Sequence, residues 1–391
     1  MKMKKDIAKL FSDAKQDNVY LKICAPMVRY SKVQFRSLVK QYGVDLTFTP
    51  MIMADSFCQN EKARYSEFST TSNDAPLIVQ FAAKNTEDFK DASLLVSPYA
   101  DGVDLNCGCP QRWAMKDGYG CALLSQPELI SDLVRAVKRN LHSNFSVSVK
   151  VRILKDLRST IDLCQQLEHC GVNFLTVHGR TTTQKSGEEV NVEVLNEVCK
   201  SLQIPVVANG GVKTLDDANL LFESTNCGGV MAASGILSNP ALFTGANKTP
   251  LHCIKMWMDI KDWDIANINF QCYHHHLVFM LDKILTRKQK QVFNYLSTFE
   301  DVDDYLQKYV FKDWDSYGFK SYVGDKLIVC EFNDEITLKH SNKCRGCRRS
   351  TCYCICEKYD SNITEGKFYS AYVKDYDDAD YMESNLFLEP L

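Results

Sequence analysis

The sequence contains no long apolar run. No stretch of it is apolar over a sufficient length to resemble a transmembrane span. Residues 1–18 are basic for only a few positions and lack the apolar core of a secretory signal. We therefore expect no membrane partner, and a cytoplasmic protein with the nucleus as an alternative location.

The net charge is also small. The 391 residues sum to a formal charge of −3, with 45% hydrophobic and 24% charged residues, which is the composition of a soluble globular protein. Any contact to nucleic acid must therefore be local. Cysteine, by contrast, is abundant, with 17 residues. In the absence of a secretory signal, most of these thiols are expected to be reduced core residues or ligands rather than disulfides.

A dinucleotide-binding glycine motif is missing too. No G-x-G-x-x-G follows a predicted strand, which disfavours an open doubly wound sheet. Instead, short β-branched runs alternate with amphipathic stretches of helical length, the pattern of repeated βα units. The predicted strands are Leu21–Cys24, Asp45–Phe48, Leu77–Phe81, Gly102–Leu105, Ser146–Val151, Phe174–His178, Pro205–Ala208 and Gly229–Ala232. The predicted helices between them include Lys32–Gln41, Glu87–Val96, Pro127–Asn140, Leu157–Cys170 and Leu215–Phe222. This order predicts an α/β fold, a closed (β/α)8 TIM barrel over residues 18–245.

Polar residues and glycines gather at the carboxyl ends of these strands, where a barrel carries its active site. In chain order they are Pro26, Met27, Gln80, Asn106, Cys107, Cys109, Lys150, Arg152, His178, Arg180, Asn209, Gly211, Ser234 and Gly235. Each one alone is more often a packing or surface residue. Because seven strand ends of one rim carry such residues, the rim is the predicted functional site.

The residue types at this rim suit a flavin mononucleotide. Glycine turns after the last two strands can present backbone N–H groups to a phosphate. Lys150 and His178 can stabilise negative charge on a reduced ring. The amides of Gln80 and Asn106 suit the polar edge of a heterocycle. We therefore predict FMN as a cofactor.

Several stretches resemble one known family. They are APMVRYSKVQFRSLV, LIVQFAA, DLNCGCPQRWAMKDGYGCALL, VSVKVR, TVHGRT and VVANGGV. They look like the flavin-dependent tRNA dihydrouridine synthases from about residue 21 to 310, with D-x-N-x-G-C-P as the most diagnostic motif. CAPMVRYSK and NCGCPQRWAM resemble the eukaryotic branch that modifies positions 20a and 20b of the tRNA D loop. The resemblance implies a protein that binds tRNA and uses NADPH or NADH to reduce uridine to 5,6-dihydrouridine. We expect it to be a monomer.

The resemblance also implies a role for Cys109, the cysteine before proline in that motif. In the family, this residue is the general acid that protonates C5 of the uracil when the reduced flavin passes hydride to C6. The step needs the thiol, and a cysteine with an ordinary pKa of about 8.5 is mostly protonated at neutral pH. Cys107 occupies the variable position of the motif and is predicted to be a small buried residue. A metal site at this C-x-C pair is disfavoured because it supplies only half of a tetrahedral site.

The other contacts of the family carry over one by one. The implied FMN contacts are Pro26, Met27, Gln80, Lys150, His178, Asn209, Gly211, Ser234 and Gly235. The implied substrate contacts are Asn106, Arg152 and Arg180. One position departs from the family, since Ser234 stands where an arginine usually precedes the glycine. The missing guanidinium removes a phosphate contact and is expected to weaken FMN binding by about 1.5–3 kcal/mol.

Residues 246–312 have helical patterns without strands between them, and they predict a small helical domain that in the family grips tRNA. Its clustered basic residues are Lys283, Arg287, Lys288 and Lys290. They could contact phosphates, although a solvated helix face is the commoner meaning of such a run. The triplet His274–His276 points in different directions on a helix, so packing or hydrogen bonding is favoured over a metal cluster.

The two ends of the chain lie outside the resemblance. Residues 1–17 are predicted to be an N-terminal lead, and residues 313–391 a Cys-rich extension. The candidate metal ligands of the extension are Cys344, Cys347, Cys352, Cys354 and Cys356, preceded by His340. A C-x-x-C pair followed by closely spaced cysteines makes one zinc site chemically reasonable, although the spacing is shorter than in common zinc ribbons. A redox-sensitive, irregular or partly disordered tail is the alternative.

Two other functions stay open. The chain could be a tRNA-binding or chaperone-like protein with a degenerate flavin site, a reading motivated by Ser234. Another flavin barrel, such as a dihydroorotate or enoate reductase, would explain the rim but not the basic helical appendage. The combination of Cys109, Lys150 and His178 favours the tRNA reductase.

Overall fold

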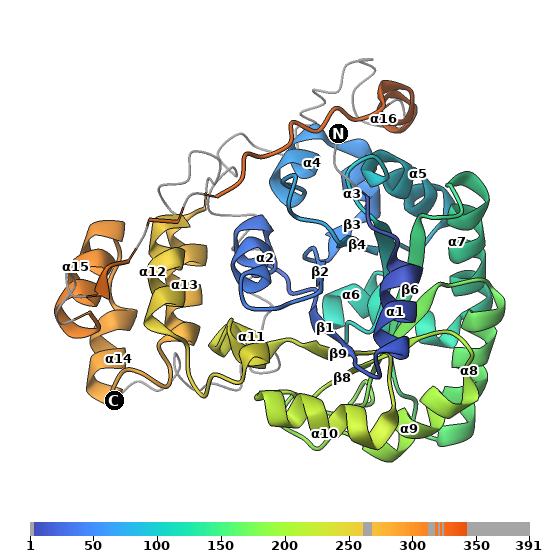
Figure 1. Cartoon of the computed structure of the whole chain (residues 1–391). Coiled ribbons are helices and arrows are strands. Elements are labelled where there is room, and N and C mark those ends of the chain that lie inside the picture. The colour runs from blue at the N-terminus through green and yellow to red at the C-terminus, as the bar shows by residue number, and fades with distance from the viewer. Residues whose placement is uncertain (1–3, 261–267, 312–316, 320, 323, 342–391) are drawn as a thin grey trace.

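The computed structural model describes residues 4–260, 268–311, 317–319, 321–322 and 324–341. In this part of the chain, eight parallel strands close into a barrel, as predicted (Figure 1). They are β1 (Leu21–Cys24), β2 (Leu46–Phe48), β4 (Leu77–Ala82), β5 (Gly102–Cys107), β6 (Ser146–Arg152), β7 (Phe174–His178), β8 (Val206–Asn209) and β9 (Gly229–Ala232). Neighbours in this order are hydrogen-bonded, and β9 pairs back to β1, which closes the ring.

Helices cover the outside of the barrel. They are α2 (Val33–Lys40), α5 (Thr86–Val96), α7 (Pro127–Asn140), α8 (Leu157–His169), α9 (Val192–Ser201) and α10 (Leu215–Thr225). Helix α9 was not predicted from the sequence. The two-residue strand β3 (Ile52–Met53), which pairs with the end of β4, was not predicted either. Strands β5 and β6 run further than predicted and carry their last residues, Cys107 and Arg152, into the rim.

The barrel strands are mainly apolar because both of their faces are covered. All six residues of β4 and of β5 are buried. Gly102 opens β5 where β6 passes closely, since a Cβ at this position would lie 2.5 Å from the carbonyl oxygen of Ser146. The close approach of these strands therefore requires glycine.

The N-terminal lead contains a helix, α1 (Ile7–Gln16), which Asp6 caps by accepting from the backbone N–H of Lys9. Its buried face includes Phe11, whose ring lies 5.1 Å from that of Phe174. Phe174 is the first residue of β7, so α1 covers the amino-terminal end of the barrel, opposite the predicted site.

Further helices follow the barrel: α11 (Ser234–Ser238), α12 (Leu251–Ile260), α13 (Phe270–Met280), α14 (Arg287–Asn294) and α15 (Phe299–Tyr309). Helices α12 and α13 lie beside α2 (Figure 1). His276 is fully buried in this junction, with its ring 4.6 Å from Phe35 and 4.3 Å from Trp257. His274 bonds the carbonyl oxygen of Phe293 at 2.9 Å. The histidine triplet is therefore used in packing and hydrogen bonding, as predicted.

The described part of the C-terminal extension returns to the barrel. The ring of Phe332 packs against Phe57 and Tyr99. Helix α16 (Asp334–Ser341) follows, and its His340 is buried and bonds Asp91 of α5 at 2.7 Å. The five cysteines proposed as zinc ligands, from Cys344 to Cys356, lie outside the described residues. None of the helices in the described ranges has the length and apolar character needed to cross a membrane.

Candidate active site

Strand register brings the predicted residues together at the carboxyl end of the barrel. Asn106 of β5 pairs with Lys150 of β6. Arg152 of β6 pairs with His178 of β7, which in turn pairs with Asn209 of β8. Four consecutive strands therefore bring residues from Asn106 to Asn209 onto one arc of the rim.

This arc concentrates positive charge. Burial, together with the charge of Arg152, lowers the pKa of Lys150 to about 8. Among the described residues, no hydrogen bond or ion pair to the Lys150 ammonium is found. Burial and the nearby cations also hold the pKa of His178 well below its usual value, so its ring is neutral at pH 7. Arg180 donates to Nε2 of His178 at 3.2 Å, and because a guanidinium can only donate, the ring proton must be on Nδ1.

The loop that carries Cys109 is held from several sides. Asn106 Oδ1 accepts from the backbone N–H of Gly108 at 3.2 Å and of Cys109 at 3.0 Å. Arg152 Nε donates to the carbonyl oxygen of Gly108 at 2.9 Å. The carbonyl oxygen of Cys109 accepts from the N–H of Cys121 at 2.9 Å. The backbone on both sides of the thiol is therefore fixed.

The Cys109 thiol is partly buried at the mouth of the barrel. Its Sγ lies 3.6 Å from Gln111 Oε1, which also accepts from the indole N–H of Trp113 at 3.0 Å. Burial raises the pKa of Cys109, while Arg152 and Lys150 act in the opposite direction. The net shift is upward, so the group is a thiol at neutral pH. Cys107 is fully buried, which confirms its prediction as a packing residue.

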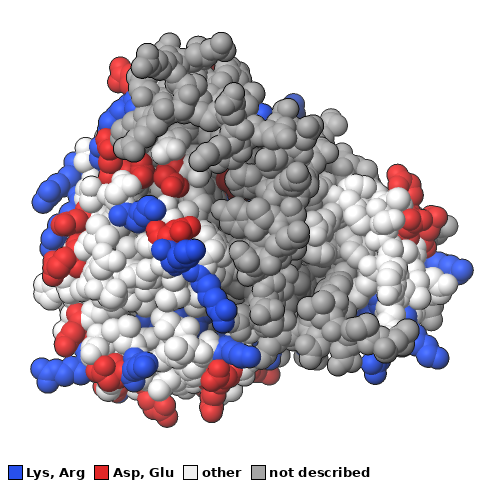
Figure 2. All heavy atoms as spheres, turned by 180° about the vertical axis from the view of Figure 1, so that it is seen from behind, with Lys and Arg blue, Asp and Glu red and all other residues white. Residues whose placement is uncertain are grey.

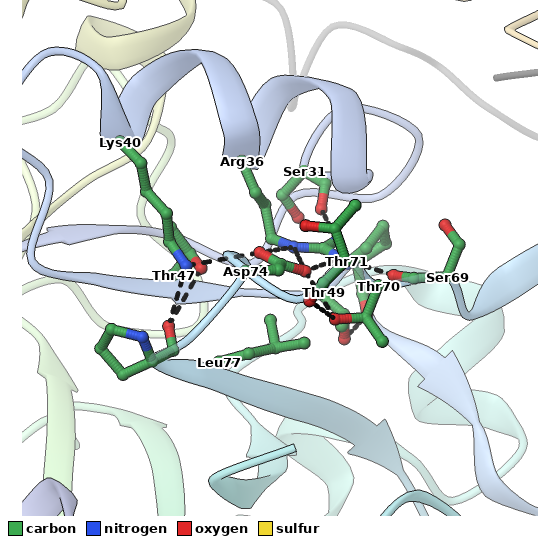
Figure 3. A network of polar contacts seen from close by, with 12 residues as sticks. Ser31, Arg36, Lys40, Thr47, Thr49, Ser69, Thr70, Thr71, Asp74 and Leu77 are labelled. Carbon is green, nitrogen blue, oxygen red and sulfur yellow. Dashed lines mark hydrogen bonds and ion pairs between the residues drawn. The ribbon is translucent and has the colours of Figure 1, made fainter. Parts of the chain in front are cut away.

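The loop after β1 carries Pro26 and Met27. Ser31 Oγ accepts from the N–H of Met27 at 2.9 Å and donates to its carbonyl oxygen at 3.2 Å. Arg36 of α2 donates to the carbonyl oxygen of Ser31 at 2.8 Å and forms a buried ion pair with Asp74 at 2.6 Å (Figure 3). A buried charge pair on the outside of the barrel thus holds the loop that enters the site.

The turns after β8 and β9 are tightly packed. Gly210 has φ +123°, and a Cβ there would lie 2.9 Å from the His178 ring. A Cβ on Gly235 would lie 2.3 Å from the carbonyl oxygen of Val212. Asn209 uses its side-chain N–H to bond the carbonyl oxygen of Met231 on β9 at 2.9 Å. The neighbouring Ser234 and Gly211 are exposed, so they are the accessible members of the predicted phosphate cradle.

Arg180 and the basic residues of the helical part differ in their exposure to solvent. Arg180 is buried, and besides its bond to His178 it donates to the carbonyl oxygen of Glu188 at 2.6 Å. These contacts support the loop after β7. On the helical part, Arg287 and Lys288 are exposed, whereas Lys290 pairs with Asp282. Figure 2 shows Lys and Arg interspersed with Asp and Glu on the described part of one face, without one large basic area.

The rim fits the FMN that the sequence predicts. An ammonium without a protein partner in the described ranges, a neutral imidazole and two arginines suit a ring that gains negative charge on reduction. The side chain of Gln80 is only 1% exposed and is bonded within the barrel, so Lys150 and His178 offer more accessible ring contacts.

Two residues were given no role from the sequence: Asp104, the first residue of the D-x-N-x-G-C-P motif, and Ser148. Both lie inside the barrel, and Ser148 Oγ donates to Asp104 Oδ1 at 2.7 Å. Burial raises the pKa of Asp104 to about 6, against the hydrogen bonds from Ser148 and Gln80. The signal for Asp104 was an acidic residue inside a predicted buried strand, at the first position of the cysteine motif.

A match to a family model shows to which protein family the chain belongs. The model described as dihydrouridine synthase matches residues 23–322, which include the whole rim and the helices after the barrel. The chain belongs to the dihydrouridine synthase family. The match therefore covers the barrel, the helices that follow it and the D-x-N-x-G-C-P loop.

Similar dihydrouridine synthases come from several eukaryotes. A Mus musculus protein named as a tRNA-dihydrouridine(20a/20b) synthase-like protein is 47% identical over 319 residues, 81% of this chain and 94% of the relative. A Schizosaccharomyces pombe protein with the 20a/20b name is 43% identical over 289 residues, 73% of this chain and 87% of the relative. A Rattus norvegicus protein named for positions 16/17 is 36% identical over 265 residues, 65% of this chain and 60% of the relative. Similarity is thus higher to the two proteins named for 20a/20b.

Proposed function

We propose that this protein reduces uridine to 5,6-dihydrouridine at positions 20a and 20b of tRNA, with FMN and NADPH or NADH, and with Cys109 as the general acid. The position rests on the names of the more similar relatives. The observation that carries the chemistry is the Cys109 thiol on a fixed loop, beside a cationic rim at the mouth of the barrel, where burial raises its pKa. When bound, FMN would supply hydride transfer from the nicotinamide to C6 of the uracil.

The residues of the chain would hold and protonate the reactants. Lys150 and His178 would lie against the flavin ring, and the turns at Gly211 and Ser234 against its phosphate. The S–H bond of Cys109 breaks as the C5–H bond of dihydrouridine forms, which leaves a thiolate. Arg152 and Lys150 stabilise that thiolate, since their charges lower the pKa of Cys109. The thiolate then takes a proton from solvent, so each uridine consumes one NADPH and one proton.

The test compares Cys109→Ala with Cys107→Ala, which removes the other thiol of the same motif. The full chain is saturated with FMN, and NADPH oxidation is followed with unmodified tRNA, together with dihydrouridine mapped by position. We expect Cys109→Ala to lose activity by about 10²–10⁴-fold, the usual contribution of a general acid. Cys107→Ala should keep the native rate.

Two results would contradict the proposal in different ways. Full activity of Cys109→Ala would refute the acid assignment. Absence of dihydrouridine from FMN-saturated native protein would refute the enzymatic function and favour the tRNA-binding alternative.

A further inference from the structure

We propose that Asp104 is a positioning residue for the cysteine loop: its carboxylate sets the direction of a hydrogen-bond chain through Gln80 and Asn106 to the backbone of Cys109. Its role in catalysis rests on the proposed function. Asp104 has an exposed fraction of 0%, so its neighbours inside the barrel reach it and a molecule on the rim does not. It can influence a reaction there only through other residues.

Strand register places the first part of this hydrogen-bond chain. Gln80 of β4 pairs with Asp104 of β5, and Asp104 pairs with Ser148 of β6. Side chains of paired residues on neighbouring strands point to the same face of a sheet. The three polar groups therefore meet inside the barrel, where Gln80 Nε2 donates to Asp104 Oδ2 at 2.8 Å and Ser148 bonds Oδ1.

In the second part of the hydrogen-bond chain, the order of donors and acceptors is fixed. Asn106 Nδ2 donates to Gln80 Oε1 at 2.9 Å, and Asn106 Oδ1 accepts from the N–H groups of Gly108 and Cys109. An ionised carboxylate can only accept and a backbone N–H can only donate, so the two ends of the chain fix both amides between them. Turning either amide over would bring two donors together on one side and two acceptors on the other.

An acceptor at position 104 is therefore needed at the buried end. Without it, the Gln80 amide would lose its partner inside the barrel, and an unsatisfied buried donor is costly. The amide would then turn or shift, and Asn106 would lose its bond to Gln80 Oε1. The effect reaches Cys109 because Asn106 is the side chain that accepts from its N–H.

The test uses Asp104→Asn and Asp104→Leu. An asparagine can keep its oxygen toward Gln80 and turn its N–H toward Ser148 Oγ, which can accept, so the chain survives without the charge. Leucine of similar size offers no acceptor. We expect Asp104→Asn to keep kcat within about fivefold and Asp104→Leu to lower it by about 10–100-fold with little change in KM for tRNA, since a small misplacement of a reacting group is enough.

A second readout needs neither FMN nor tRNA. Alkylation of Cys109 by iodoacetamide is followed by peptide mass spectrometry, with the partly buried Cys272 of α13 as internal reference. Asp104→Leu should change the rate at Cys109 several-fold and leave Cys272 unchanged, whereas Asp104→Asn should match the native protein. Ser148→Ala is the matched control, because it removes the other bond of Asp104 and leaves the chain to Cys109 intact. If Asp104→Leu does not fold, Asp104→Ser replaces it, since its hydroxyl is too short to reach Gln80.

Two outcomes would overturn the inference. One is native kcat and native Cys109 alkylation in Asp104→Leu; the other is equal loss in Asp104→Asn and Asp104→Leu, which would show that the charge matters and the chain does not. Failure of the proposed function is distinguishable, because it would appear as absence of dihydrouridine from FMN-saturated native protein, and failure of the acid assignment would appear as full activity in Cys109→Ala. The alkylation measurement would still test the chain in either case.

Discussion

Replacing Arg36 with methionine tests how the loop that carries Met27 is held. The Arg36 guanidinium is 1% exposed and donates to both carboxylate oxygens of Asp74 and to the carbonyl oxygens of Ser31 and Ser69 (Figure 3). Methionine fills a similar volume and leaves the Asp74 carboxylate, which is 0% exposed, without its main partner.

Removing one partner of a buried ion pair usually costs about 3–5 kcal/mol, because the other charge stays buried. Asp74 also keeps Lys40 at 3.4 Å and the hydroxyl of Thr70 at 3.1 Å. These contacts offset part of the loss, so we expect the free energy of unfolding to fall by about 3 kcal/mol, the lower end of that range.

Urea unfolding followed by circular dichroism measures this difference. The control is Lys200→Met, which removes an ion pair of 2.9 Å to Glu197 whose side chains are 63% and 44% exposed. That change should cost less than about 1 kcal/mol. A loss below about 1 kcal/mol in Arg36→Met as well would refute the view that the buried pair holds this loop.

Two further predictions concern FMN binding and acid stability. Ser234→Arg places a guanidinium on an exposed position in the predicted phosphate cradle. FMN binding, measured by quenching of flavin fluorescence, should become tighter by about 10-fold or more. Unchanged FMN affinity would contradict the inferred phosphate contact. Burial lowers the pKa of His276 to about 3. As the pH falls from about 6.5 to 3, the histidine is therefore protonated in the unfolded protein but not in the folded protein, and the free energy of unfolding decreases by about 1.4 kcal/mol per pH unit. His276→Phe should remove this slope in urea midpoints compared at pH 7 and pH 5, and an equal slope in both proteins would show that His276 is not its source.

Local patterns in the sequence were sufficient for the barrel. Each strand is a short run of mainly apolar residues bounded by turn residues, as expected for parallel strands covered on both faces, so the eight strands could be found one at a time. The same applies to the positions of Cys109, Lys150 and His178, because strand ends locate the rim. The N-terminal helix α1 was not predicted, although its buried residues Ile7, Phe11 and Ala14 have the spacing of one helical face.

What the sequence could not supply was the pairing between distant residues. Arg36 and Asp74 are 38 positions apart, Gln80 and Asp104 are 24 apart, and His340 reaches Asp91 across 249 positions. Such partners depend on strand register and on which helix packs beside which, and no local pattern encodes either. The return of residues 324–341 to the barrel belongs to the same class.

The sequence by itself thus determined the barrel, its functional rim and the cysteine that we propose as the acid, because strand patterns and one motif are local properties. Only the tertiary structure decided how that cysteine is held. The carboxylate of Asp104 acts on the loop through two amides from two strands, and their common direction arises only when the closed barrel brings them within hydrogen-bonding distance.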